Sequence, residues 1–88
     1  MIIKEYTITT AQGMHARPAT QLVKLAKEFN STISIKKGDK TVKMNSLLNI
    51  LSLSIKSGET ISLIMDGDDE VSATVAIDNF FTDTLKHL

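Results

Sequence analysis

The sequence contains no cysteine, and only one arginine and one proline, among its 88 residues. Without cysteine the chain forms neither a disulfide nor a thiolate metal site, which fits a reducing compartment such as the cytoplasm. Ten basic residues balance ten acidic ones, so the charge gives no reason to expect binding to nucleic acid or to an anionic membrane. Aromatic residues make up only 5% of the chain, which disfavours a ligand cage built from rings.

Long hydrophobic runs are also missing. No apolar stretch approaches the ~20 residues that span a bilayer, and the first residues lack the basic and then apolar pattern of a signal peptide. The length suits one domain, residues 1–88, with a single core. We therefore expect a soluble cytoplasmic protein that is not inserted in a membrane, and the small size and neutral charge favour a monomer.

The pattern of apolar residues predicts four strands and three helices. Alternation and β-branched residues favour strands over residues 2–8, 32–36, 41–44 and 60–65. Helical spacing, N-cap signals and acidic first turns favour helices over residues 16–28, after Ser46, and over 71–85. The last helix should bury Ala73, Ile77, Leu85 and either Phe80 or Phe81. This order predicts an α+β two-layer sandwich, with the helices covering one face of the sheet.

The single arginine and the single proline are adjacent, at Arg17 and Pro18, just after His15. Histidine offers a nucleophilic nitrogen near neutral pH, and arginine offers a planar fork of donors for phosphate. A helix that begins at Ala16 directs the free amides of Ala16 and Arg17, and the positive end of its dipole, toward an anion. The segment therefore predicts a phosphoryl group carried on His15, with its charge covered by Arg17.

No second catalytic group accompanies this segment. The sequence shows no carboxylate pair at suitable local spacing, no glycine-rich phosphate loop and no neighbouring histidine for a metal. This favours a carrier that works with partner enzymes and needs neither cofactor nor metal. The alternative is structural: Arg17 neutralises Glu28 or Asp39, and Pro18 only begins a helix.

A leucine-rich run follows Ser46. Five apolar residues within seven positions exceed what one buried face of a short helix requires, so we expect some of them to be exposed as a partner surface. The alternative is a segment that is fully buried. The hydroxyl of Ser46 is either an N-cap alone or also a phosphorylation site.

The segment Gly13-Met14-His15-Ala16-Arg17-Pro18-Ala19 resembles the active-site signature of the HPr family, the histidine-containing phosphocarriers of the bacterial phosphoenolpyruvate-dependent sugar phosphotransferase system. Residues 45–53 resemble the serine site and apolar helix of that family, and the resemblance covers essentially the whole chain. It implies an open-faced β-sandwich of four antiparallel strands with three helices on one face. It also implies that His15 accepts a phosphoryl group on Nδ1 from phosphorylated enzyme I and passes it to enzyme IIA domains, with Arg17 as the stabilising residue.

The resemblance further implies a surface for docking these partners, formed by Thr20, Lys24, Lys27, Leu47, Leu48 and Leu51. In some bacteria a dedicated HPr kinase/phosphorylase modifies the serine that Ser46 matches, which weakens acceptance of phosphate at the histidine. The chain departs from the family pattern near this serine: Asn45 replaces a frequent lysine, Asn49 and Ser54 replace frequent glycines, and the three leucines replace isoleucine or methionine. These changes alter the surface that such a kinase would meet.

Three other functions are compatible with the residues. The first is an HPr paralogue in a regulatory, nitrogen-related phosphorelay. The second is a small hydrolase that resembles acylphosphatase and binds phosphate through Arg17. The third is a non-catalytic interaction module that binds through the leucines.

Overall fold

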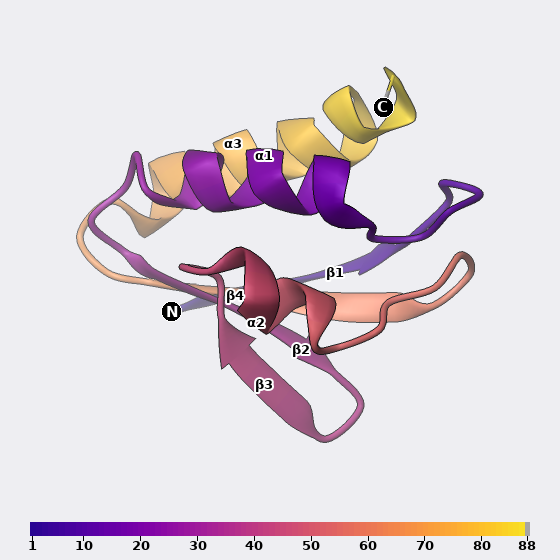
Figure 1. Ribbon diagram of the computed structural model, residues 1–88. Coiled ribbons are helices and arrows are strands. Elements are labelled where there is room, and N and C mark those ends of the chain that lie inside the picture. The colour runs from indigo at the N-terminus through magenta and orange to yellow at the C-terminus, as the bar shows by residue number, and fades with distance from the viewer. Residues whose placement is uncertain (88) are drawn as a thin grey trace.

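The computed structural model describes residues 1–87 and arranges them in two layers, with helices on one face of a sheet (Figure 1). The strands are β1 (Ile2–Thr7), β2 (Thr32–Lys37), β3 (Lys40–Lys43) and β4 (Thr60–Asp66). The helices are α1 (Ala16–Ala26), α2 (Leu47–Leu51) and α3 (Glu70–Thr82), followed by the 3₁₀-helix η1 (Thr84–His87). The predicted α+β sandwich and its element order are confirmed.

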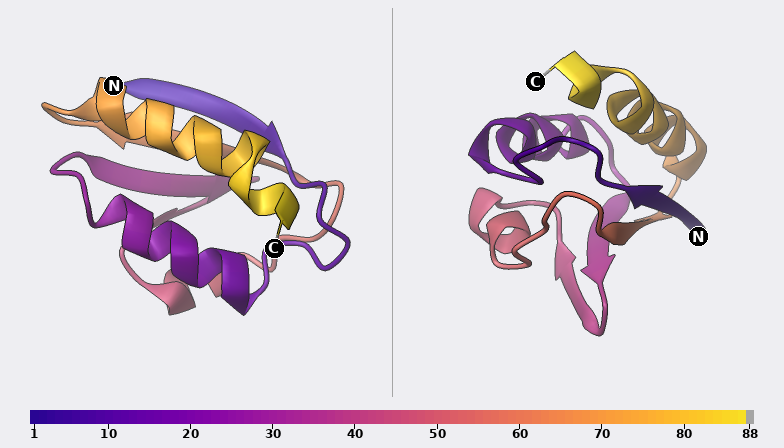
Figure 2. Two further views of the ribbon diagram at one scale, coloured as in Figure 1. Left: turned by 90° about the horizontal axis from the view of Figure 1, so that it is seen from above. Right: turned by 90° about the vertical axis from the view of Figure 1, so that its right-hand side faces the viewer.

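The sheet has the order β1-β4-β2-β3, and every neighbouring pair is antiparallel. Alternation directs one side of each strand toward the helices, so Ile35 on β2 and its register partner Leu63 on β4 are fully buried. Residues on the other side, such as the pair Ile3 and Ile64, face away from the helices. Figure 2 shows the three helices lying over one side of the sheet, while the other side stays open.

Helix α1 is amphipathic and buries Ala19, Leu22 and Val23, as its apolar spacing predicts. It ends at Ala26 rather than at the predicted residue 28. The reason is local: the amide of Glu28 donates to Leu25 and that of Phe29 donates to Ala26, so the last turn tightens to 3₁₀ geometry.

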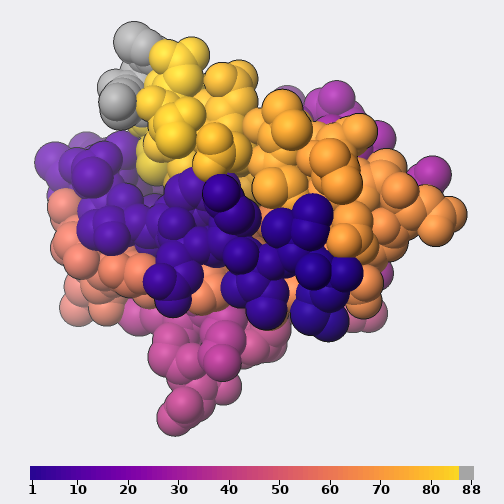
Figure 3. Space-filling model, turned by 180° about the vertical axis from the view of Figure 1, so that it is seen from behind, coloured from indigo at the N-terminus to yellow at the C-terminus, as the bar shows by residue number. Residues whose placement is uncertain are grey.

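Helix α3 ends at Thr82, three residues before the predicted limit, because Asp83 leaves the helical region with φ of −129°. Leu85 is still buried, from the separate helix η1. Both Phe80 and Phe81 are buried, and the ring of Phe81 stacks on Tyr6 of β1 at 4.4 Å between ring centres. Figure 3 shows the consequence from behind, with β1 lying alongside α3.

Two loops at one end of the molecule are joined by a carboxylate. Asp69 accepts hydrogen bonds from the amides of Asn30 and Ser31, both at 2.8 Å, and from the Ser31 hydroxyl. Gly67 allows this approach, because a Cβ there would lie 2.7 Å from the Cα of Ser31. These donors, the Ser31 hydroxyl first, hold the pKa of Asp69 below its ordinary 3.8.

The chain leaves α2 through Ser54, which has a left-handed backbone with φ of +50°. The carbonyls of Leu53 and Ser54 accept hydrogen bonds from the Lys37 ammonium at 3.1 and 2.9 Å. Lys37 also forms an ion pair with Glu59 at 2.9 Å. The β2–β3 hairpin thereby holds the loop between α2 and β4. Across residues 1–87, no helix has the length and apolar character needed to cross a membrane.

Candidate phosphoryl-acceptor site

The site begins at the N-terminus of α1. His15 is the N-cap residue, with an extended backbone at φ −88° and ψ −175°, and its carbonyl accepts the hydrogen bond of Ala19 at 3.1 Å. The amides of Ala16 and Arg17 precede this bond and have no acceptor within the helix. Pro18, the next residue, is buried and carries no N–H. Two free amides therefore lie at the positive end of the helix dipole, next to the imidazole.

The imidazole of His15 is half-buried, and its Nδ1 lies 3.2 Å from the carbonyl oxygen of Gly13. A carbonyl oxygen can only accept, so in this contact Nδ1 carries a proton and donates it. The ring is partly exposed, and its Nδ1 already has the Gly13 carbonyl as its hydrogen-bond partner.

Arg17 is exposed and lines the same pocket as His15, a hollow of about 380 Å³ that also includes Thr10, Ala11 and Gln12. Within residues 1–87 its guanidinium forms no ion pair, so the alternative pairing with Glu28 or Asp39 is wrong. The only guanidinium of the chain thus stands free beside the histidine, in a position to receive an anion.

The loop before α1 is held against the loop that follows α2. Gly13 has φ of +68°, and a Cβ there would lie 2.5 Å from the carbonyl oxygen of Ile55. The next residue, Met14, is buried and its amide donates to the same Ile55 oxygen at 3.0 Å. Glycine is required here for both its backbone conformation and its lack of a side chain. This anchoring fixes the point from which His15 emerges.

Sequence reasoning missed one residue of this loop. The hydroxyl of Thr10 donates to the Gly13 carbonyl at 2.9 Å, so that oxygen accepts from both Thr10 and His15. The available signal was the hydroxyl residue three positions before a turn glycine, a spacing that permits such a side-chain hydrogen bond.

The leucine-rich helix lies beside α1 on the same face of the sheet (Figure 1). Ser46 caps it, because its side chain accepts from the amide of Asn49 at 3.4 Å. Leu48 is 76% exposed, while Leu47 and Leu51 are half-buried against the core. The expectation that some leucines are exposed is confirmed, and a fully buried segment is wrong.

Two departures from the family pattern contact each other at this helix. The side-chain amide of Asn49 donates to the side chain of Asn45 at 3.2 Å and to the carbonyl of Lys43 at 3.0 Å. The first turn of α2 is thereby fastened to the end of β3, next to Ser46.

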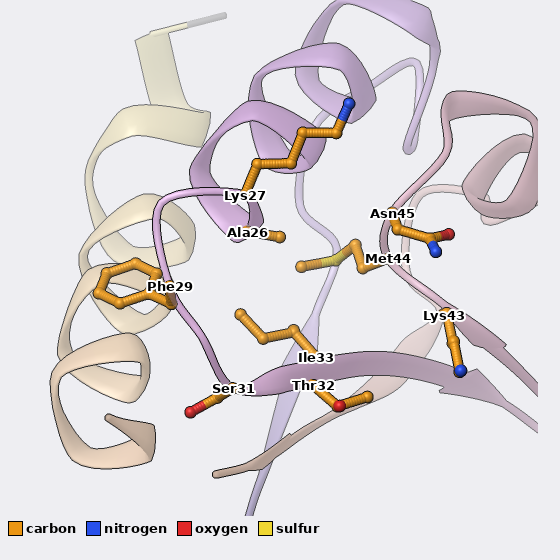
Figure 4. A pocket seen from close by; sticks show the side chains of 9 residues that line it. All are labelled: Ala26, Lys27, Phe29, Ser31, Thr32, Ile33, Lys43, Met44 and Asn45. Atoms are coloured by element: carbon orange, nitrogen blue, oxygen red, sulfur yellow. The ribbon is translucent and has the colours of Figure 1, made fainter. Parts of the chain in front are cut away.

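The polar residues predicted for docking follow the outer side of α1. Lys24 and Lys27 are exposed, and the Thr20 hydroxyl donates to the Ala16 carbonyl at 2.7 Å. Lys27 lines a hollow of about 290 Å³ together with Asn45 and Met44, which places the end of α1 across from the residue before Ser46 (Figure 4). Lys24 lies instead along the groove between α1 and α3. The structure thus joins Lys27 to the α2 side and separates Lys24 from it.

Comparisons with known proteins agree with this geometry. The family model described as "PTS HPr component phosphorylation site" matches residues 2–83. The chain is 34% identical to the phosphocarrier protein HPr of Lysinibacillus sphaericus over 83 residues, which cover 94% of each chain. It is 40% identical to the HPr-like protein Crh of Halalkalibacterium halodurans over 77 residues, 88% of this chain and 92% of the relative. The solved structure of a histidine-containing phosphocarrier protein from Mycoplasma superposes with a TM-score of 0.91 at 36% identity, covering 96% of both chains. The chain therefore belongs to the HPr family of phosphocarrier proteins of the phosphotransferase system.

Proposed function

We propose that His15 is the transient phosphoryl acceptor, which takes the group from phosphorylated enzyme I and passes it to enzyme IIA proteins for sugar uptake. One observation carries this proposal: within residues 1–87, a half-exposed imidazole and an unpaired guanidinium line one pocket, and the two free amides of the first turn of α1 lie next to the imidazole. The protein is a carrier, and its partners supply the rest of the chemistry.

The transfer step follows from the ring. Nδ1 attacks phosphorus, the Nδ1–P bond forms, and the bond between phosphorus and the donor breaks. Because Nδ1–H is bonded to Gly13, the ring must first turn away from this carbonyl, lose the Nδ1 proton to solvent water and hold a proton on Nε2 instead. The Ala16 and Arg17 amides then bind the phosphoryl oxygens, and the guanidinium of Arg17 offsets the remaining charge.

The experiment is incubation with phosphoenolpyruvate and enzyme I, followed by assay of acid-labile phosphate. The native chain should incorporate it and His15→Ala should not. Arg17→Ala should slow transfer about tenfold or more, the loss expected for a charge-assisted hydrogen bond, with Arg17→Lys in between. Acid-labile phosphate on His15→Ala would refute the assignment, and phosphorus NMR identifies the modified nitrogen.

The partner surface is proposed to comprise Thr20, Lys24, Lys27, Leu47, Leu48 and Leu51. Leu48→Ala should weaken binding to enzyme I without loss of stability, because this side chain is 76% exposed. Val71→Ala is the matched control, since Val71 is 68% exposed but lies on α3. Equal effects of the two substitutions on calorimetric affinity would remove α2 from the docking surface.

Ser46 is proposed as a regulatory phosphorylation site for an HPr kinase/phosphorylase. Phosphate there would place negative charge beside the α2 leucines that dock partners. The test is incubation with the kinase and ATP: acid-stable phosphate should appear on the native chain and be absent from Ser46→Ala. No incorporation would leave Ser46 as the helix cap alone.

The alternative to sugar uptake is an HPr paralogue in a regulatory, nitrogen-related phosphorelay. Transfer rates to sugar-specific and to nitrogen-branch enzyme IIA proteins separate the two. The family membership favours the carrier over a hydrolase.

We also propose that the chain acts as a single domain and as a monomer in the cytoplasm, and sedimentation in solution tests its oligomeric state.

A further inference from the structure

We propose that Thr10 is a positioning residue for His15: by sharing the Gly13 carbonyl with Nδ1–H, its hydroxyl sets how readily the imidazole turns to accept a phosphoryl group. This inference rests on the proposed role of His15. It assigns to Thr10 no contact with the phosphoryl group.

The geometry that carries the inference is the convergence of two donors on one oxygen. Thr10 Oγ1 lies 2.9 Å from the Gly13 carbonyl oxygen, and His15 Nδ1 lies 3.2 Å from it. A third bond, from the Gly13 amide to the Thr10 carbonyl at 3.0 Å, closes the turn. Thr10 also lines the pocket of His15 and Arg17.

The shared oxygen cannot follow the ring. Gly13 is buried against the backbone of Ile55 and Lys56, where a Cβ would have no room, and the next amide is bonded to Ile55. The carbonyl therefore stays in place when the imidazole turns. The free energy needed to break the bond from Nδ1–H therefore depends on which hydrogen-bond donor the Gly13 carbonyl retains after the ring has turned.

Thr10 is that partner. A carbonyl oxygen has two lone pairs, and the hydroxyl holds one of them whether the ring is present or absent. Without the hydroxyl, the ring is the only side-chain donor to this oxygen among residues 1–87, and its departure leaves a part-buried carbonyl unpaired. Two donors on one oxygen also weaken each other, so removing Thr10 strengthens the bond from Nδ1–H.

The consequence for the reaction is a shift between the two neutral ring forms. Nδ1 can attack phosphorus only when the proton resides on Nε2 and Nδ1 has its lone pair free. The hydroxyl of Thr10 favours this reactive form by loosening the contact with Gly13. Loss of the hydroxyl should therefore raise the population of the Nδ1–H form and slow acceptance of the phosphoryl group.

The test compares Thr10→Val, which has nearly the same shape without the hydroxyl, with Thr10→Ser, which retains it. Thr9→Val is the matched control, because Thr9 is exposed and adjacent. Two readouts are needed: the proportion of neutral ring forms from nitrogen NMR of His15, and the rate of phosphoryl acceptance from enzyme I.

Thr10→Val should increase the Nδ1–H form and slow acceptance about fivefold, the effect of leaving one carbonyl unpaired. Thr10→Ser and Thr9→Val should stay within about twofold of the native rate. An unchanged ring equilibrium in Thr10→Val, or a Thr10→Ser variant that behaves like it, would overturn the proposal.

The NMR measurement needs no enzyme I, so it decides the role of Thr10 separately from the proposed function. A native chain that fails to accept phosphate counts against His15 as carrier and leaves the ring equilibrium to judge Thr10. If Thr10→Val does not fold, Thr10→Ala must show the same shift toward Nδ1–H, and its absence refutes the inference.

Discussion

Replacing Ser54 with glycine should stabilise the protein. Ser54 has φ of +50°, a left-handed conformation that costs a residue with a Cβ about 1–2 kcal/mol. Its side chain is exposed and forms no hydrogen bond within residues 1–87. Glycine removes the strain but adds backbone entropy to the unfolded chain, which opposes folding by about 0.5–1 kcal/mol. The balance is a gain of about 0.5–1 kcal/mol in the free energy of unfolding.

The assay is urea and thermal unfolding followed by circular dichroism, where this gain should raise the Tm by about 2–8 °C. The carbonyl of residue 54 keeps its hydrogen bond from Lys37 in the variant, so the loop has no reason to rearrange. Ser72→Gly is the control: it places glycine on the exposed side of α3 and should lower stability by a few tenths of a kcal/mol. If Ser54→Gly lowers stability as Ser72→Gly does, the left-handed backbone at residue 54 carries no strain and the reasoning fails.

The remaining predictions concern two hydrogen-bonded groups. The pKa of Asp69 is lowered by its donors, so its contribution to stability is complete above its ordinary pKa of 3.8 and is lost as pH falls through the lower folded value. The Asp69→Asn variant should therefore be less stable than the native chain near neutral pH and should lose less stability as the pH falls. The control variant Asp68→Asn, at an exposed position, should unfold in acid as the native chain does. Identical acid unfolding curves for Asp69→Asn and the native chain would contradict this prediction. Burial, and secondarily the hydrogen bond to Asp78 at 3.0 Å, raise the pKa of Tyr6. Its phenol should therefore ionise well above pH 10 in an ultraviolet titration. The stability that the neutral phenol contributes should be complete below its ordinary pKa of 10 and be lost as the pH rises toward the higher folded value. Tyr6→Phe should reduce the free energy of unfolding by about 1 kcal/mol, and no change would show that the hydrogen bond contributes nothing.

The sequence predicts the fold well where local patterns and burial coincide. Alternation in β4 places Ile61, Leu63 and Met65 on the buried side, and the same rule gives Ile33 and Ile35 of β2. These strands are predictable because their apolar faces meet the helices directly.

What the sequence does not reveal depends on contacts between distant segments. The sequence predicts that either Phe80 or Phe81 is buried. In the structure both rings are buried, because Tyr6 on the edge strand β1 stacks on Phe81. The order of strands that brings Tyr6 there is not visible in local patterns. The Ser46 cap and the start of α1 at Ala16 are, by contrast, short-range features, and the structure confirms both predictions.

The candidate site shows the same division. Proximity of His15, Arg17 and the free amides follows from their adjacency in sequence and from where α1 begins. The hydrogen bond from Nδ1 to the Gly13 carbonyl cannot be predicted in this way, because it requires the left-handed backbone of Gly13 and the close packing of Gly13 against the backbone of Ile55.

The pairing of β1 with β4 affects how the chain is made. Ile2 lies opposite Met65 and Thr7 opposite Thr60, so β1 pairs with a strand that is synthesised after β2 and β3. At about 5–20 residues per second, β1 waits about 3–12 s for its partner to be synthesised. During that interval the nascent chain contains α1 and the β2–β3 hairpin but lacks β4, the central strand that pairs with both β1 and β2. The time needed to synthesise β4, rather than the formation of local helices, therefore limits when the sheet can form.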